Sequence, residues 1–259
     1  MYILTAEPDM EKEEALLRKR IEELARVCYQ RDIPTHMDFL NLNEQTIFHS
    51  MIRSIPEVRH FLTGGYAMAE RKVVCFLPSY ALDEEAPISC MEVEPLNARF
   101  AEELSHRDYL GALMNLGIDR SKIGDILVQD KKAYVFAMDD MSAYLAENLL
   151  SVRKTTVKTK ISPAMEMSIE PRFEQMEGSI ASERLDNILA FVYRCSRGKI
   201  VPYVEGEKVF VNGRLTVKSS AVLKPGDIVS VRGLGKFRYL GIQNETKKGR
   251  LFVAAERFI

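Results

Sequence analysis

The chain has 259 residues, of which 46% are hydrophobic and 28% charged, a composition typical of a folded protein of two or three domains. No apolar run approaches the roughly eighteen residues of a membrane span, and we expect no cleaved leader, so the sequence predicts a soluble cytoplasmic protein. Its four cysteines and four histidines lack metal-ligand spacing, and we therefore expect no disulfide framework, zinc site or other cofactor.

Charge is unevenly distributed along the chain. The segment 179–259 holds 15 Lys and Arg against 7 Asp and Glu, a net charge of +8, whereas the segment 1–178 sums to −9. Clustered Lys and Arg favour a polyanionic partner because their binding releases counterions from phosphates. The basic block therefore predicts RNA or DNA binding, with a face that only confers solubility as the alternative.

Residues 1–72 are predicted to form a helical region. A charged amphipathic helix is expected from Pro8 to Tyr29, and a second helix is expected to begin near Asn43, as its N-cap, and to end before Pro56. The apolar face of the first helix is predicted from residues three and four apart, namely Leu16, Leu17, Ile21, Leu24 and Val27.

A glycine pair follows this helical region. Gly64, Gly65 and Tyr66 precede the basic pair Arg71 and Lys72. Two glycines can bring backbone amides close to a phosphate, which makes this segment a candidate second site. The alternative is an ordinary loop between a helix and a strand, and the spacing alone favours that loop.

Residues 73–165 are predicted to form a ferredoxin-like domain, which makes the whole chain α+β. The predicted elements after a strand at 73–77 are a strand at 88–93, a helix at 105–116, strands at 123–129 and 133–138, a helix at 141–150 and a strand at 155–161. RNA-recognition domains share this order with many enzymes, so it does not identify a function. The segment also lacks the aromatic motif with which such domains stack bases. The stretch from Ser162 to Gly178 is interpreted as a connecting strand or a linker, and residues 166–180 are taken as the linker.

Residues 181–259 are predicted to place two short helices on a small sheet. Ser182 is expected to cap a helix that ends at Tyr193, and Ser196 a second helix that Gly206 closes. Asn212-Gly213 predicts a type I′ hairpin turn. A second hairpin is expected at 241–252, with a basic tip at 246–250.

This segment resembles the αL RNA-binding domain first described in ribosomal small-subunit protein four. The resemblance lies in Arg184-Leu185-Asp186, Ser196-Arg197, Lys199, the 209–213 hairpin, Lys218-Ser219 and Gly226-Asp227. It implies that the helices present basic side chains to RNA phosphates and that Asp186 orients a nearby arginine. The RNA-binding residues that we expect are Arg184, Arg194, Ser196, Arg197, Lys199, Asn212, Arg214, Lys218, Arg232, Lys236, Lys247 and Lys248. Each arginine could instead be a solvated surface residue, and turn geometry alone requires Asn212.

Over its whole length the chain resembles the YlmH family of bacterial RNA-binding proteins. This wider resemblance lies in the Gly64–Lys72 segment, the 108–125 helix–strand unit and the 184–235 and 246–250 stretches. It implies association with ribosomal or transfer RNA, binding to the ribosomal large subunit in ribosome-associated quality control, and a link to cell division. It also favours a functional role for Gly64, Gly65, Tyr66, Arg71 and Lys72.

Two other classes of protein remain open. An RNA-modifying enzyme would use the C-terminal module for targeting, but the segment 1–178 shows no synthetase nucleotide motif and no glycine-rich S-adenosylmethionine loop. Gly233-Leu234-Gly235 is no dinucleotide motif, because no helix is expected after it and Arg238 stands where the third glycine would be. We therefore expect a non-catalytic protein. A DNA-binding or cell-division scaffold is the second alternative, with division proteins as partners.

Overall fold

The computed structural model describes residues 7–82, 85–164, 172–245 and 249–258. It divides into two compact units, Met1–Glu170 (unit 1) and Pro171–Ile259 (unit 2). Both units combine helices with sheets, which confirms the predicted α+β class. Among the described helices, none has the length and apolarity needed to cross a membrane.

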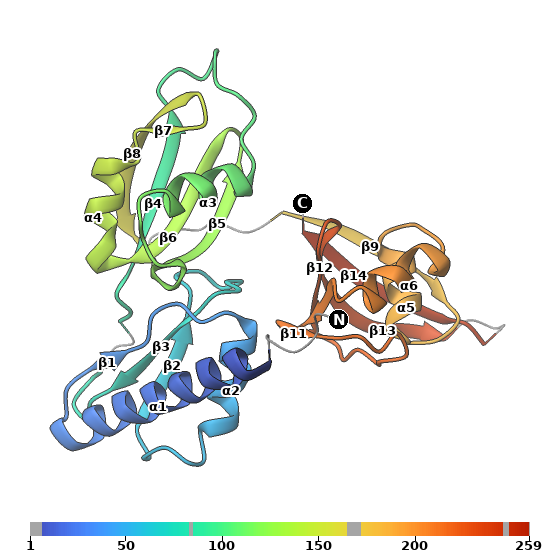
Figure 1. Cartoon of the computed structure of the whole chain (residues 1–259), viewed down its shortest axis with the longest axis horizontal. Coiled ribbons are helices and arrows are strands. Elements are labelled where there is room, and N and C mark those ends of the chain that lie inside the picture. The colour runs from blue at the N-terminus through green and yellow to red at the C-terminus, as the bar shows by residue number, and fades with distance from the viewer. Residues whose placement is uncertain (1–6, 83–84, 165–171, 246–248, 259) are drawn as a thin grey trace. The chain divides into compact units, whose positions relative to one another are not determined.

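The first part of unit 1 packs two helices on a small sheet (Figure 1). The sheet is antiparallel, with strand order β1-β3-β2. Helix α1 buries Ile21, Leu24, Ala25 and Cys28, whereas Leu16, which was predicted on this face, is 67% exposed. The elements are α1 (Glu7–Arg31), β1 (Thr35–His36), α2 (Leu42–Met51), β2 (Arg59–Thr63) and β3 (Val73–Leu77).

Two boundaries in this region differ from the sequence prediction. Helix α2 is capped by Asn41 rather than Asn43, because the Asn41 side chain accepts from the Glu44 amide while the Glu44 carboxylate accepts from the Asn41 amide. The region before residue 73 is not only helical, since β2 is a strand. Strand β3 pairs with β1 and β2, so it does not open the following domain.

The second part of unit 1 is a five-stranded antiparallel sheet with strand order β5-β6-β4-β8-β7. Its strands and helices follow one another in the predicted order, with the short strand β7 added. Helices α3 and α4 cover one face through Tyr109, Leu113 and Leu145. The opposite face carries Phe136 and packs on β3. The elements are β4 (Ile88–Pro95), α3 (His106–Met114), η1 (Arg120–Lys122), β5 (Ile123–Gln129), β6 (Lys132–Met138), α4 (Asp139–Asn148), β7 (Ser151–Val152) and β8 (Thr155–Pro163).

Unit 2 is a six-stranded sheet with two short helices on one face (Figure 1). The strand order is β11-β10-β12-β13-β14-β9, and every neighbouring pair is antiparallel. Helix α5 completely buries Leu185, Ile188, Leu189 and Val192 against the sheet. The elements are β9 (Phe173–Ile180), α5 (Leu185–Val192), α6 (Arg197–Glu205), β10 (Val209–Val211), β11 (Arg214–Leu215), β12 (Ile228–Val231), β13 (Gly235–Glu245) and β14 (Leu251–Phe258).

In unit 2, the turn and the helix caps were predicted more accurately than the longer segments. Asn212 and Gly213 have φ values of 49° and 76°, as a type I′ turn requires. Ser196 and Gly206 are the two cap residues of α6. The predicted linker, however, is wrong for Phe173–Ile180, which form edge strand β9 paired with β14. The second hairpin is longer than predicted, and the 246–248 part of its tip lies outside the described residues.

The start of α5 also differs from the prediction. Its N-cap is Arg184, not Ser182. The Ser182 hydroxyl and carbonyl instead accept hydrogen bonds from the Asn187 side-chain amide, at 2.7 and 3.2 Å. This interaction fixes the chain just before the helix and leaves Arg184 at the helix entrance.

Candidate nucleic-acid interface

Two arginines of unit 2 are held by one buried carboxylate. Asp186, in the first turn of α5, has a side chain that is only 1% exposed. Its two oxygens accept from the Arg184 guanidinium at 3.2 and 3.1 Å, and Oδ2 also accepts from Arg197 at 2.5 Å. The arginine side chains are 42% and 52% exposed. Burial favours the neutral acid, but the two guanidinium groups outweigh burial and hold the Asp186 pKa below its usual range.

The backbone explains why this cluster forms. The loop before β12 packs against the start of α5, because the amides of Leu185 and Asp186 donate to the carbonyls of Ala221 and Ser219 at 2.7 and 3.1 Å. This loop places the exposed Lys218 immediately before Ser219. Helix α6 begins at Arg197 and carries the exposed Lys199 in its first turn. Four of the predicted RNA-binding residues therefore lie on the segments that meet at Asp186.

Ser196 adjoins these segments as the N-cap of α6, and the other predicted residues of unit 2 lie elsewhere. Arg194 follows the far end of α5 and pairs with Glu174 at 2.6 Å, with a side chain that is 71% exposed. The Asn212 side-chain nitrogen donates to the Asp227 carboxylate, and its side-chain oxygen accepts from the Ile228 backbone amide, both at 2.9 Å. These hydrogen bonds hold the turn together. Ser196 and Arg214 are exposed. Lys247 and Lys248 lie outside the described residues.

The sheet face opposite the helices combines cations with aromatic rings. Along β13, Phe237 and Tyr239 point into the core, so the alternating Lys236 and Arg238 point to the other face. The cations lie over phenylalanine rings, with distances to the ring centres of 4.8 Å for Arg232 and Phe210, 4.5 Å for Lys236 and Phe258, and 5.6 Å for Arg238 and Phe173. Sequence reasoning named Arg232 and Lys236 but missed Arg238 and the rings, although the alternation along β13 signals them.

The candidate second site of unit 1 forms mostly internal contacts. The Asp125 carboxylate accepts from the Tyr66 hydroxyl at 2.8 Å and from the amides of Glu70 and Arg71 at 2.7 and 3.2 Å. The Arg71 guanidinium donates to the carbonyls of Phe39 and Ile123 at 2.8 and 3.1 Å, and its burial lowers its pKa. The amides of Glu70 and Arg71 are thus committed to a carboxylate of the same chain rather than to a phosphate.

Close packing explains the glycine pair. A Cβ on Gly64 would lie 2.3 Å from both the Ala69 Cβ and the Arg71 carbonyl oxygen. Gly65 has a φ of +90°, and a Cβ there would lie 2.8 Å from the Phe136 ring. Gly65 also lines a cavity of about 310 Å³ together with Tyr66 and Lys72. The glycines are therefore required by the fold, and Lys72 remains as a cation beside a small cavity.

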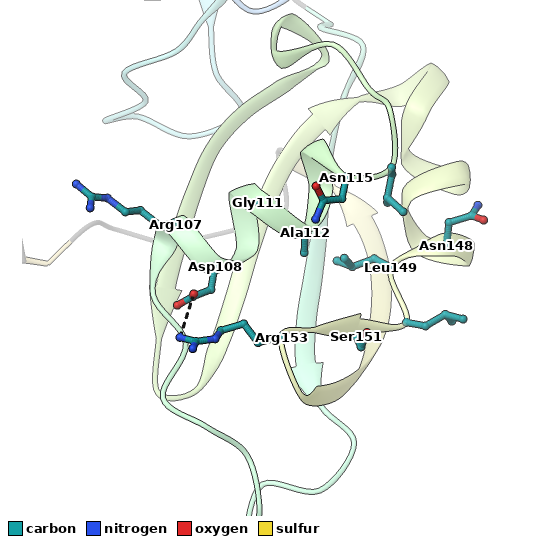
Figure 2. A pocket seen from close by; sticks show the side chains of 11 residues that line it. Arg107, Asp108, Gly111, Ala112, Asn115, Asn148, Leu149, Ser151 and Arg153 are labelled. Atoms are coloured by element: carbon teal, nitrogen blue, oxygen red, sulfur yellow. Dashed lines mark hydrogen bonds and ion pairs between the residues drawn. The ribbon is translucent and has the colours of Figure 1, made fainter.

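Unit 1 contains a larger pocket that sequence reasoning did not predict. It has a volume of about 540 Å³ and lies between α3 and the 148–153 segment that joins α4 to the β7–β8 turn (Figure 2). Its lining includes Arg107, Asp108, Gly111, Asn115 and Arg153. The first four lie along α3 and its C-cap, and only the fold brings Arg153 beside them, so no local motif identified the pocket.

The described residues contain no group of three or more His, Cys, Asp or Glu side chains placed to hold a metal ion. Burial raises the pKa of the Cys75 and Cys90 thiols to about 12, so both are protonated at neutral pH.

Comparisons with known proteins give a match to an RNA-binding family, and the matched domain lies in unit 1. The family model described as "Putative RNA-binding domain in YlmH" matches residues 83–166. A curated relative from Bacillus subtilis (strain 168), named "Ribosome-associated protein quality control protein P2", is 32% identical over 224 residues, which are 85% of this chain and 86% of the relative. A solved structure, "Cell division protein ylmH from Streptococcus pneumoniae", covers 66% of this chain and 99% of its own chain with a TM-score of 0.50. At 21% identity, that structure shows a shared fold alone.

These comparisons define the class of protein and then the family. The matched domain and the name of the Bacillus subtilis relative support an RNA-binding role. The chain belongs to the YlmH family, as its sequence pattern predicted.

Proposed function

We propose that the protein is a non-catalytic RNA-binding protein whose unit 2 is an αL module that clamps structured ribosomal or transfer RNA. We propose the ribosomal large subunit as its place of action, in ribosome-associated quality control in the cytoplasm. The name of the Bacillus subtilis relative supports the link to the ribosome. The net charge of +8 over residues 179–259 supports a phosphate-rich partner.

The arginine pair on Asp186 is the observation that supports the clamp most strongly. An arginine held by a carboxylate through one part of its guanidinium still has other N–H donors, and its side chain has already lost much of its rotational freedom. Binding of a phosphate then costs less conformational entropy than binding by a freely moving side chain. Asp186 is nearly fully buried, so its role is to position Arg184 and Arg197 rather than to contact RNA itself.

The acidic charge of the segment 1–178 adds selectivity to this proposal. Its net charge of −9 repels a polyanion in general and disfavours diffuse binding along any RNA. An RNA that contacts the basic face of unit 2 is therefore favoured when most of its phosphates stay away from the acidic surface. This preference favours a folded RNA with a defined shape over an arbitrary strand.

Sucrose-gradient co-sedimentation with separated ribosomal subunits tests the proposal. Charge reversal at Arg184 and Arg197 would leave the buried Asp186 without its cations and could unfold the unit. The better variant is Lys199→Glu/Lys218→Glu, because both side chains are exposed and near the cluster. The matched control is Lys19→Glu/Arg53→Glu, which makes the same charge change at exposed positions of unit 1.

We expect the wild type and the control to migrate with the large subunit and the Lys199→Glu/Lys218→Glu variant to remain at the top of the gradient. Circular dichroism should show that all three proteins are folded. Failure of the wild type to migrate with either subunit would contradict ribosome binding. Equal migration of the wild type and the variant with the large subunit would contradict the assigned face and direct the search for the ribosome-binding surface to unit 1.

A further inference from the structure

The pocket between α3 and the 148–153 segment has the build of a ligand site. We call it the α3 pocket. Its lining includes the side chains of Ala112, Leu116 and Leu149 beside the polar Asn115 and Arg153, and the lining is more polar than apolar. A volume of about 540 Å³ is within the usual range for small-ligand sites.

Gly111 lines this pocket although the fold does not require a glycine there. It lies inside α3, and a Cβ at this position would meet no other atom within 4 Å. Glycine inside a helix destabilises it relative to alanine. The missing side chain thus gives the helix no benefit, and its effect is to keep the wall of the pocket open.

Arg153 is an unfavourable residue for its backbone position, where a glycine would be expected. It is the first residue of the two-residue turn between β7 and β8, with a φ of +51°, where glycine would be less strained. Its guanidinium nevertheless lies on the pocket rim, 3.4 Å from the Asp108 carboxylate, with a side chain that is 61% exposed. Asp108 is itself fixed by the Ser105 amide and hydroxyl, at 2.8 and 2.7 Å. The strained turn therefore places a cation, held by an anchored carboxylate, at the mouth of the pocket.

These features are better suited to binding one nucleotide than to binding a continuous stretch of phosphates. Residues 83–166 contain 10 Lys and Arg against 15 Asp and Glu, so their overall charge repels a phosphate backbone. A local site can overcome this repulsion with Leu116 and Leu149 against one side of a base, the Asn115 amide for its polar edge and Arg153 for a phosphate. Arg107 extends away from the other labelled side chains in Figure 2 and could meet the next phosphate of the strand.

We propose that the α3 pocket holds one unstacked nucleotide of a single-stranded RNA segment. The proposal goes beyond the clamp in unit 2, and it takes RNA as the ligand class because residues 83–166 match the RNA-binding family domain. The clamp and the pocket are separate sites on separate units, so each can fail without the other.

Fluorescence anisotropy with labelled single-stranded RNA hexamers of adenosine, cytidine and uridine tests the pocket. All proteins are full chains that carry Lys199→Glu/Lys218→Glu to reduce binding by the clamp. In this background Gly111→Leu fills the pocket and Arg153→Gly removes the cation. Ala143→Leu, an exposed position on α4 outside the pocket, is the matched control for an added side chain.

We expect Gly111→Leu and Arg153→Gly each to weaken binding of the preferred hexamer about tenfold, the effect of losing the contacts to the base or one charged contact. The Ala143→Leu control should bind like its parent. Thermal unfolding midpoints should not fall in either pocket variant, because both substitutions suit the local backbone. Weaker binding together with an unchanged or higher midpoint cannot arise from loss of structure.

Two results would overturn the proposal. Equal hexamer affinity of the parent and both pocket variants would show that RNA does not enter the pocket. Binding of a nucleoside monophosphate as tightly as the hexamer, with the same sensitivity to Gly111→Leu, would assign the pocket to a free nucleotide instead of RNA. Ribosome co-sedimentation reports only on the clamp, so its result does not decide between these outcomes.

Discussion

Asp186 shows how a single residue can organise the basic face. Its carboxylate is almost fully buried, yet the ion pairs with Arg184 and Arg197 keep its pKa low. We expect Asp186→Asn to lower the free energy of unfolding by about 1–3 kcal/mol at pH 7, because charged hydrogen bonds to both guanidinium groups are lost. Urea denaturation measures this difference.

The same residue predicts a pH dependence with a defined sign. A carboxylate whose pKa is lowered in the folded state stabilises the protein above its unfolded pKa, near 3.9, and loses this contribution as pH falls through the folded pKa. The stability difference between wild type and Asp186→Asn should therefore shrink as the pH falls below about 4. A difference that stayed constant between pH 7 and pH 3 would contradict the ion-pair account.

The cysteines provide a second prediction for single residues. Cys28, Cys75 and Cys90 are buried, and burial raises the pKa of all three thiols, for Cys75 and Cys90 to about 12. Cys195 is only partly buried. We expect a thiol reagent at pH 7.5 to modify Cys195 alone in the native protein and all four cysteines after denaturation. Rapid modification of Cys75 or Cys90 in the native state would contradict their burial.

The two predicted sites show what can be inferred about single residues. The Asp186 pairing was predictable because its partners are close in sequence and share a known motif. The internal role of Arg71 was not predictable, since the carbonyls of Phe39 and Ile123 that accept from it belong to strands and loops far along the chain. Gly111 and Arg153 gave no signal because only the fold brings them together.

Secondary-structure elements with local signals were predicted well. The Asn212-Gly213 turn and the caps of α6 depend on adjacent residues and were correct. Strand β9 was missed because it lacks a nearby partner and pairs with β14 at the other end of unit 2. The placement of β3 failed for the same reason, since its partners, not its own sequence, determine which sheet it joins.

The turn between β5 and β6 offers a prediction for one element. Asp130 and Lys131 have φ values of 49° and 67°, the left-handed conformation that a type I′ turn requires and that asparagine and glycine adopt most easily. Asp130→Asn/Lys131→Gly should therefore raise the free energy of unfolding by about 0.5–1 kcal/mol. The control is Lys160→Gly in β8, where glycine should lower stability by a similar amount. A loss of stability in both variants would show that the turn is not strained.

For the whole molecule, the separation of charge between the two parts of the chain is the main determinant of the proposed function. The segment 179–259 attracts phosphates, and the segment 1–178 repels them. Binding should then depend on unit 2 for affinity and on the acidic part for selectivity between RNAs. This division was visible in the sequence, because net charge needs no knowledge of the fold.

The salt dependence of affinity for a structured ribosomal RNA fragment tests this account most directly. If about five phosphates are neutralised, the logarithm of the binding constant should fall against the logarithm of the salt concentration with a slope of roughly −3.5 to −4.5. The Lys199→Glu/Lys218→Glu variant should show a slope smaller in magnitude by about 2, whereas Lys19→Glu/Arg53→Glu should retain the wild-type slope. A wild-type affinity that does not change with salt would contradict the clamp.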